Sequence, residues 1–379
     1  MALTTLPTAA FATGSVGTSQ LADGAVTTEK LVADVNFRNL LINGDMSIAQ
    51  RSTSTSSYSG ISYSTVDRFK TVFEYGTYTV SQESLSSGAA YNAGFRTAFK
   101  ALVTSTASPG AAGEQVTFEQ RIEGLMCQAL KKGTSNAESL TLSFWVKTNK
   151  TGIYTLELED KDNTRSFSQT YTVSSADTWE KKTLTYAGDT TGAFDNDNGA
   201  SLKCNFWLGA GSDFTSGTFQ NSWGSKIAAN RVSSSQVNLA DNTANEFYIT
   251  GVQLEAGTTA SDFEFLPYDV NLQRCKRYFS YIPPSTHFSS AVMRNNTLSY
   301  GFGYFFEVEM RASPTITYAD IIMYKGDVIS SAATFSLNDI NKFGFGNSAI
   351  AASSLSATDG DAVLIFVGGS GYVNMDAEL

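Results

Sequence analysis

Residues 139–147 read Ser-Leu-Thr-Leu-Ser-Phe-Trp-Val-Lys, and this stretch decides the fold of the central part of the chain. Apolar and polar side chains alternate along it, as they do in a β-strand with one buried face. The residues that share the apolar face are Leu140, Leu142, Phe144 and Val146. Trp145 and Lys147 therefore point to the opposite face, together with Thr141 and Ser143.

The same two-residue period recurs on both sides of this stretch. Residues 153–159 alternate in the same way, and further strands are predicted at residues 179–186, 202–208 and 247–254. Clusters of Gly, Asn and Asp, such as Asp195-Asn-Asp-Asn-Gly199, separate these segments as turns do. Several short strands with such turns predict an all-β body, either a sandwich or a jelly roll.

Two short helices are expected to interrupt the strands. Residues 122–130 carry apolar side chains at helical spacing. A second helix is predicted over residues 270–279, with Asp269 as its N-terminal cap and three basic residues near its negative end. Pro283-Pro284 breaks the chain after this helix.

These elements divide the chain into four segments. Residues 1–38 form a leader, residues 39–268 a sandwich or jelly-roll body, residues 269–284 a short helical neck, and residues 285–379 a small second β domain. The last segment is rich in aromatic residues and low in charge. It either folds alone or shares its core with other copies of the chain.

The composition excludes several classes of protein. Only 16% of the 379 residues are charged and 42% are apolar, which is typical of β proteins with many turns. The net charge of −10, without a basic stripe, argues against nucleic-acid binding. The widely spaced Cys127, Cys204 and Cys275 fit buried free thiols better than disulfides or a zinc site. No basic residue precedes Lys30 and the longest apolar run is residues 362–367, so neither a signal peptide nor membrane insertion is expected.

A ten-residue repeat precedes the body. Gly14-Ser-Val-Gly-Thr-Ser-Gln-Leu21 is followed by Gly24-Ala-Val-Thr-Thr-Glu-Lys-Leu31. The large apolar side chains of the two copies are Val16, Leu21, Val26 and Leu31. They bury too little surface to order the repeat alone, so each copy needs a neighbour to stack on. The repeat predicts either a short oligomeric stem or a disordered Ser/Thr/Gly-rich leader.

Several motifs of the chain resemble those of bacteriophage tail fibre and tail-associated proteins, especially from marine and cyanobacterial phages. They are Asn39-Leu-Leu-Ile-Asn-Gly-Asp-Met-Ser-Ile-Ala-Gln-Arg51, Asp67-Arg-Phe69, Leu142-Ser-Phe-Trp-Val-Lys147, Thr178-Trp-Glu-Lys-Lys-Thr-Leu-Thr-Tyr186, Phe247-Tyr-Ile-Thr-Gly-Val-Gln-Leu-Glu-Ala-Gly257, Phe263-Glu-Phe-Leu-Pro-Tyr268, Cys275-Lys-Arg-Tyr-Phe279 and Asp376-Ala-Glu-Leu379. The repeat ending at Leu31 is similar to those of phage fibre stems, which favours a stem over a disordered leader.

The central block also resembles the carbohydrate-binding jelly rolls attached to polysaccharide-degrading enzymes. The shared pattern is the opening strand at Asn39, the Leu-Ser-Phe-Trp-Val-Lys strand, a strand led by Trp179 and a closing Val-Gln-Leu-Glu strand. This resemblance implies a jelly-roll fold. It does not by itself establish sugar binding, because fold and function separate easily.

Trp145 and Trp207 are the leading candidates for a ligand site, because each points away from the apolar face of its strand. Flat aromatic rings on a concave β face suit the apolar C–H faces of sugars. Lys147, Asn205 and Arg165 would supply hydrogen bonds to sugar hydroxyl groups. The alternative is that both tryptophans pack on a helix, a loop or a neighbouring subunit.

The sequence offers little for catalysis or metal binding. It has no nucleophile elbow, metal pair or phosphate loop. Two acidic pairs are present, Glu119 with Glu123 and Glu157 with Glu159. They are more typical of solvated faces or ion pairs than of glycosidase carboxylates. Turn chemistry explains the Asp-rich loops at residues 160–163 and 195–199, with a structural calcium ion as the less favoured alternative.

The leading hypothesis is a non-enzymatic, homotrimeric phage tail fibre, without cofactor or metal, that adsorbs to a host surface polysaccharide or lipopolysaccharide. It would be made in the bacterial cytoplasm and attach through its N-terminus to other virion tail proteins. One alternative is a structural tail adaptor or decoration protein. A second alternative is a polysaccharide-depolymerising tailspike.

Overall fold

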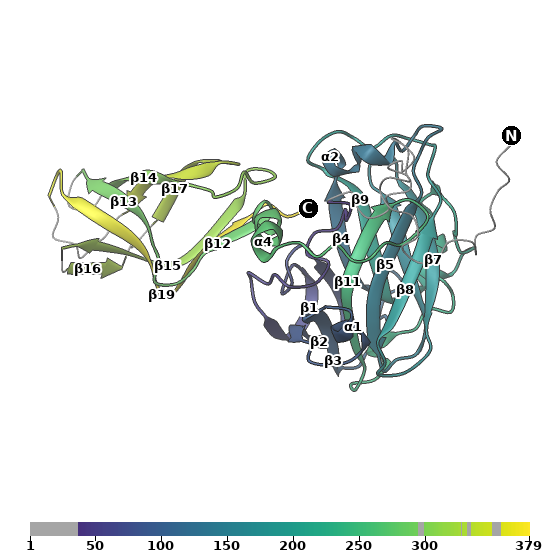
Figure 1. Cartoon of the computed structure of the whole chain (residues 1–379). Helices are drawn as coiled ribbons and strands as arrows, with labels where there is room; N and C mark the ends of the chain where they lie inside the picture. Colours follow the sequence, from purple (N-terminus) through teal and green to yellow (C-terminus); the bar gives the residue numbers. More distant parts are fainter. Residues whose placement is uncertain (1–36, 295–298, 327, 332–334, 351–357) are drawn as a thin grey trace, which may run out of the picture.

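The computed structural model describes residues 37–294, 299–326, 328–331, 335–350 and 358–379. These residues form an all-β protein with a jelly-roll body and a second, smaller sheet, with helix α4 between them (Figure 1). The predicted all-β class is therefore confirmed. The predicted stem residues Val16, Leu21, Val26 and Leu31 lie outside the described residues.

The described part of the body contains an 11-stranded sheet with the order β10-β7-β6-β9-β4-β2-β3-β11-β5-β8, and β1 pairs with β2. Its strands are β1 (Ser54–Ser62), β2 (Lys70–Ser84), β3 (Thr97–Ser105), β4 (Gln115–Glu123), β5 (Leu140–Thr148), β6 (Gly152–Asp160), β7 (Arg165–Val173), β8 (Glu180–Tyr186), β9 (Ala200–Ala210), β10 (Gly224–Ser225) and β11 (Glu246–Ala256). Short helices lie between strands at α1 (Ala89–Asn92), α2 (Gly124–Cys127), η3 (Gln128–Leu130), α3 (Ser212–Thr215), η4 (Ala228–Asn230) and η5 (Leu239–Asp241).

This sheet curls so that its two halves face each other across one core. The rings of Phe144 on β5 and Phe206 on β9 lie edge to face with centroids 5.2 Å apart, although β4, β2, β3 and β11 separate the two strands in the sheet. Both rings are fully buried. Burying one such side chain stabilises the fold by about 1.5–3 kcal/mol, so the apolar faces of the strands hold the two layers together.

The five strands predicted for the body are present as β5, β6, β8, β9 and β11, with ends that differ by one or two residues. Leu142, Phe144 and Val146 are fully buried on β5, whereas Trp145 between them is partly exposed. Alternation predicted these strands because a pleated strand sends successive side chains to opposite faces.

The predicted helix at residues 122–130 is wrong in its extent. Ile122 belongs to β4, where it pairs with Leu202 of β9, and only the short α2 and η3 follow. Gly124 begins α2 where a Cβ atom would lie 2.0 Å from the carbonyl oxygen of Asp195. The helical spacing gave a wrong prediction because Ile122 packs in the core of the sandwich as part of β4. Strand pairing and burial there outweigh the weak local helix propensity.

The predicted neck contains a helix and a strand. Helix α4 (Tyr268–Lys276) has Pro267 at its N-cap, so Asp269 lies in the first turn instead, and Arg274 and Lys276 occupy the last turn as expected. Residues Phe279–Ile282 form β12, which pairs with β19 and so belongs to the second sheet. The three cysteines are free and buried, as the sequence predicts.

The described part of the second sheet has eight strands in the order β16-β15-β19-β13-β14-β18-β17, and β12 pairs with β19. These strands are β12 (Phe279–Ile282), β13 (His287–Met293), β14 (Ser299–Phe305), β15 (Thr315–Lys325), β16 (Val328–Ser331), β17 (Phe335–Asn341), β18 (Gly344–Ile350) and β19 (Ala362–Asp376). The long β19 contacts β12, β13 and β15 and carries the core residues Ile365, Val367 and Met375. The apolar run at residues 362–367 lies in β19.

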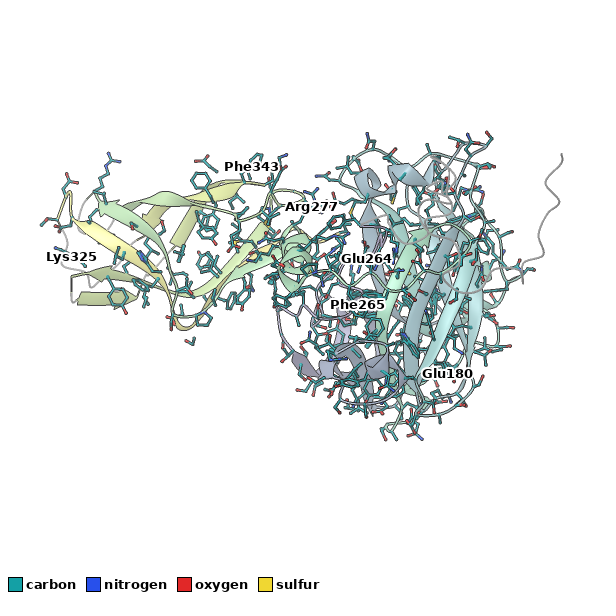
Figure 2. The ribbon with its side chains drawn as sticks, in the orientation of Figure 1. Glu180, Glu264, Phe265, Arg277, Lys325 and Phe343 are labelled. Atoms are coloured by element: carbon teal, nitrogen blue, oxygen red, sulfur yellow. The ribbon has the colours of Figure 1, made fainter. Side chains whose placement is uncertain are left out.

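The last residues of the chain fasten the second sheet to the body. The Arg68 side chain is 1% exposed, and its guanidinium donates to the Glu378 carboxylate and, over 2.8 Å, to the Arg121 carbonyl. Arg277, labelled at the junction in Figure 2, forms a two-pronged ion pair with Glu123 at 2.7 and 2.9 Å. Both ion pairs join the body to the part of the chain that follows it: Arg68 pairs with Glu378, and Glu123 pairs with Arg277. Charge-assisted hydrogen bonds of this kind hold the two units together at a defined angle.

Candidate functional site

The residues predicted to form one site lie in three different places. Trp207 and Asn205 lie on the outer face of β9, and Trp145 and Lys147 lie on the outer face of β5. Since Phe144 and Phe206 meet in the core, these two outer faces point in opposite directions. The prediction of a single aromatic pair is therefore wrong.

Trp207 is fully buried on its own side of the sandwich. Its ring packs on Phe214 with centroids 5.1 Å apart, and the Arg231 guanidinium lies 5.0 Å from the ring centre. Its indole N–H donates to the Glu157 carboxylate over 3.2 Å. Asn205 is buried as well, so neither residue can touch a ligand at the surface. Trp207 therefore packs against a loop, as the alternative interpretation predicts, because Phe214, Arg231 and Gln236 of residues 211–237 all contact this face.

We call the buried surface beneath that loop the covered charged face. It consists of Glu119, Glu157, Glu159, Lys203, Asn205 and Trp207, with Lys226 and Arg231 contributed by the loop. Arg231 grips Glu157 with two hydrogen bonds of 2.7 and 2.9 Å, and Lys203 contacts Glu159 at 2.8 Å. The strand carboxylates are thus ion-paired, as one of the two sequence-based interpretations expects, but they are buried rather than solvated.

The partners of these carboxylates govern their protonation. Burial alone would raise the pKa of Glu159, but Lys203 first, and then Lys226 and Arg231, hold it well below its ordinary value. The pKa of Glu119 is lowered in the same way, against its burial, by Lys203 and Arg121. A carboxylate with a lowered folded-state pKa stabilises the fold above its unfolded pKa, and this contribution is lost as the pH falls.

Glu159→Gln is expected to lower the free energy of unfolding at pH 7 by about 3 kcal/mol, because it leaves Lys203 and Lys226 without their shared carboxylate in a buried site. The difference in unfolding free energy between the variant and the wild type should shrink as the pH falls below about 4.5, because Glu159 becomes protonated in the unfolded wild-type chain. Urea denaturation at pH 7 and pH 4 measures both effects. The control is Glu138→Gln, which breaks an exposed pair with Lys131 and should cost less than about 1 kcal/mol. Equal losses for the two variants would contradict the role given to Glu159.

Arg165 lies at the edge of the body and is engaged by another side chain. Its guanidinium forms two hydrogen bonds with Asp189, of 2.7 and 3.1 Å. Lys132 contacts the same carboxylate at 3.2 Å. Because Arg165 stands neither beside Trp145 nor beside Trp207, the structure does not place it in a common site with either.

Trp145 borders an open groove of 390 Å³ on the outer face of β5 and β11, which we call the Trp145 groove. Its lining residues are Ala93, Phe95, Ser143, Trp145, Lys181, Gly251, Asp262, Phe263 and Phe265. In the sheet, Trp145 stands between Thr250 of β11 and Lys181 of β8. The neighbouring strands thus hold the indole at a fixed position on this face.

Three phenylalanines form one wall of the Trp145 groove. The ring centroids of Phe95, Phe263 and Phe265 lie 4.8–5.0 Å from one another. Phe95 is buried at the base, whereas Phe265 is 50% exposed and lies on the body close to β11 (Figure 2). Gly251 lies beneath them with a φ of 62°, and a Cβ atom there would stand 2.5 Å from the Phe95 ring. A glycine is required at this bulge of β11 because the chain is left-handed there and the ring sits directly on it.

Lys147 shares the face of Trp145 two residues further along β5. Its ammonium group lies 4.0 Å from the centre of the Tyr248 ring and 5.8 Å from that of Trp179. These cation–π contacts place Lys147 beside the Trp145 groove rather than in its lining. Of the five predicted ligand residues, Trp145 alone lines this groove, and Lys147 is its neighbour.

The rim of the groove carries one cation and one carboxylate. Lys181 and Asp262 are both exposed, and they supply a hydrogen-bond donor and acceptors beside the rings of Trp145 and Phe265. Exposed rings combined with a few polar groups can bind a ligand that has apolar faces and hydroxyl edges. The Trp145 groove is therefore suited to binding a ligand of this kind.

The Asp-rich loop at residues 160–163 is explained by its own hydrogen bonds. One oxygen of Asp160 accepts from the backbone N–H groups of Asp162 and Asn163 at 3.0 Å, and the other contacts the Lys132 ammonium at 2.6 Å. Within the described part of the chain, no group of three or more His, Cys, Asp or Glu side chains is arranged to hold a metal ion. Among the same residues, no helix has the length and apolar character needed to cross a bilayer.

Sequence reasoning missed most of the groove. In the sequence, Phe263 and Phe265 stand out only as part of the Phe263-Glu-Phe-Leu-Pro-Tyr268 motif, and Lys181 only as part of a predicted strand. The available signal was the Phe-x-Phe spacing after β11, which sends two rings to the same side of an extended segment. Phe95 comes from a distant turn, and nothing local connects it with Trp145.

No family model matches this sequence, and no curated protein matches it. Among solved structures, the chain is similar to the enzymatically active domain of tailspike protein 4 from bacteriophage CBA120, at 15% identity and a TM-score of 0.31 over 59% of this chain. The similar region spans 22% of that tailspike chain.

Two sugar-binding structures are similar at a comparable level. One is a putative sugar binding protein from Bacteroides thetaiotaomicron, with 13% identity, a TM-score of 0.28, and coverage of 57% of this chain and 99% of that one. The other is TmCBM61 in complex with β-1,4-galactotriose, with 11% identity, a TM-score of 0.28, and coverage of 58% of this chain and 99% of that one. These likenesses are distant.

Proposed function

We propose that this protein is a non-catalytic glycan-binding protein and that the Trp145 groove holds the sugar. The observation that carries the proposal is the meeting of Trp145 and the half-exposed Phe265 in one open groove. Aromatic rings gathered with a few polar groups in one concave groove are typical of small-molecule sites.

A saccharide matches the chemistry of this groove better than a wholly apolar ligand. One face of a pyranose ring carries C–H groups that pack on the Trp145 indole, and its hydroxyl edges reach Lys181 and Asp262 on the rim. The volume of 390 Å³ is within the usual range for a small-molecule site. The groove is open, so a longer polymer could pass through with one segment bound.

The acidic groups support binding without cleavage. Glycoside hydrolysis ordinarily uses two carboxylates on either side of the scissile bond. Asp262 is the one carboxylate among the described residues lining the Trp145 groove. Glu157 and Glu159 lie on the opposite side of the sandwich, buried and held by Arg231 and Lys203.

In this proposal the protein works as a phage tail fibre that adsorbs the virion to a host surface polysaccharide or lipopolysaccharide. Support comes from the body motifs that resemble phage fibre proteins and from the repeat that ends at Leu31. A homotrimer attached to other virion tail proteins through its N-terminus would present several grooves at once. Several weak sites on one particle raise avidity without any new contact.

Trp145→Ala is expected to weaken glycan binding by about tenfold or more while the protein stays folded, because a partly exposed ring is removed from the groove. A microarray of bacterial lipopolysaccharide and capsular oligosaccharides measures binding, and competition with phage for host cells measures adsorption. Phe343→Ala, which removes a ring 53% exposed on the second sheet, is the control and should bind as the wild type does.

Three results would contradict this proposal. If wild-type protein neither binds the array nor competes for host cells, the structural adaptor or decoration role becomes the better explanation. If reducing sugar is released from the host polysaccharide, the protein is a depolymerase. A Trp145→Ala protein that binds normally would move the site away from this groove.

A further inference from the structure

A second groove lies where the body meets the second sheet. We call it the junction groove; it has a volume of 740 Å³, and it shares no residue with the Trp145 groove. The body contributes Gln50 and Arg51 to its wall, and the last segment of the chain contributes Glu378. The floor is formed by β12, β15 and β19. The strands of that floor meet near α4 in Figure 1.

The register of these strands places polar and aromatic side chains in one row. Tyr281 of β12 and Thr317 of β15 both pair with Asn374 of β19. Val373 and Met375, on either side of Asn374, are buried in the core of the second sheet. Since side chains alternate along a strand, Asn374 and its two partners face away from the core and into the groove.

Two tyrosine rings lie open on this floor. Tyr281 and Tyr372 are each 39% exposed, although each belongs to a regular strand of a packed sheet. Tyr372 lies two residues from Asn374 on β19 and therefore shares its face. The floor thus offers two aromatic surfaces with an amide and a hydroxyl group between or beside them.

The charged side chains at the groove wall are already paired with one another. Arg51 contacts Asp376 at 3.0 Å and Glu378 at 3.4 Å, and its guanidinium lies 3.7 Å from the centre of the Phe279 ring. The Asp376 side chain is still 43% exposed, so it can accept hydrogen bonds from a ligand. With its arginine so engaged, the groove has no cation prepared for a strongly anionic group, and it suits a neutral ligand rich in hydroxyl groups.

We propose that the junction groove is a second saccharide site, which takes a short, neutral segment of the glycan. This rests on the proposed glycan-binding function and extends it to a separate place on the same chain. Tyr281 and Tyr372 stack on the apolar faces of the sugar rings, and Asn374, Thr317 and Asp376 bind the hydroxyl groups. Because the walls come from both units, the site is complete only while the junction holds them together.

The test uses the full chain and four variants on the same bacterial oligosaccharide microarray. Trp145→Ala and the Tyr281→Ala/Tyr372→Ala double variant each remove one groove, and the Tyr281→Phe/Tyr372→Phe variant keeps both rings at the junction. Tyr318→Ala removes a tyrosine that is 38% exposed on β15 but does not line the groove. Isothermal titration with the oligosaccharide bound best by the wild type then counts the sites.

Two sugar molecules per chain are expected for the wild type and for Tyr318→Ala, and one for Trp145→Ala and for the double alanine variant. The phenylalanine variant should lose less than the alanine variant at the junction, because stacking survives. One site in the wild type that only Trp145→Ala removes would overturn this inference and leave the proposed function standing. A single site that only the double alanine variant removes would overturn the assignment of sugar binding to the Trp145 groove and leave the junction groove as the site. No binding to the array at all would overturn both proposals.

Discussion

Trp207→Ala is expected to lower the free energy of unfolding by about 3–5 kcal/mol while leaving glycan binding by the surviving folded protein unchanged. The side chain is 0% exposed, so its removal leaves a cavity between Phe214 and Val232. It also takes the indole N–H away from Glu157, a fully buried carboxylate. Both losses act on the folded state, and neither touches the Trp145 groove. Urea denaturation measures the first effect and the oligosaccharide microarray the second.

Trp145→Ala is the matched comparison, because it removes the same side chain from the opposite face of the sandwich. Its expected cost in stability is less than about 1.5 kcal/mol, since the ring is only partly buried. A stable Trp207→Ala protein that has lost glycan binding would show that the covered charged face opens to ligand. It would restore the role first predicted for Trp207.

Arg68→Met is expected to destabilise the protein by about 3–5 kcal/mol, because it leaves the buried Glu378 carboxylate with only the longer contact to Arg51, at 3.4 Å. The side chains of Arg68 and Glu378 are 1% and 4% exposed. Burial by itself would lower the pKa of Arg68, but Glu378 first, and then Tyr278 and Tyr63, together raise this pKa above its ordinary value. The guanidinium also lies 3.3 Å from the centre of the Tyr278 ring, which it covers. Urea denaturation of the full chain measures the loss, and protease cleavage near α4 reports opening of the junction.

The double variant Arg68→Met/Glu378→Gln tests whether the pair is the cause. It should recover a large part of the stability, because no buried charge is left without a partner. Lys342→Gln, which breaks an exposed pair with Glu309, is the control and should cost less than about 1 kcal/mol. If Arg68→Met behaves like this control, the junction is held by other contacts.

Strands could be predicted from the sequence where apolar and polar side chains alternate. On β5 the alternation from Leu140 to Val146 is complete, because every second side chain enters the core. The helix predicted at residues 122–130 is wrong for a related reason. Ile122 and Leu130 both enter the core, but they do so from a strand and from a short turn, and a helix-like spacing arose by coincidence.

The candidate site could be predicted only in part. Trp145 was identified because its strand pattern marks it as outward-facing. The same pattern marked Trp207 equally well, and it could not reveal that residues 211–237 return to cover that face. Phe95, Phe265 and Lys181 come from three separate parts of the chain, so their meeting around Trp145 left no local signal.

By itself the sequence determined the all-β class, the strands of the sandwich and the inward face of each strand, because these depend on a period of two residues along the chain. Only the tertiary structure decided which outward face stays open. Coverage depends on where distant segments pack, and that is set by contacts such as Arg231 on Glu157 and Phe265 on Phe95. Trp145 and Trp207 have the same local pattern, and only the loop over Trp207 makes one a candidate ligand contact and the other part of the core.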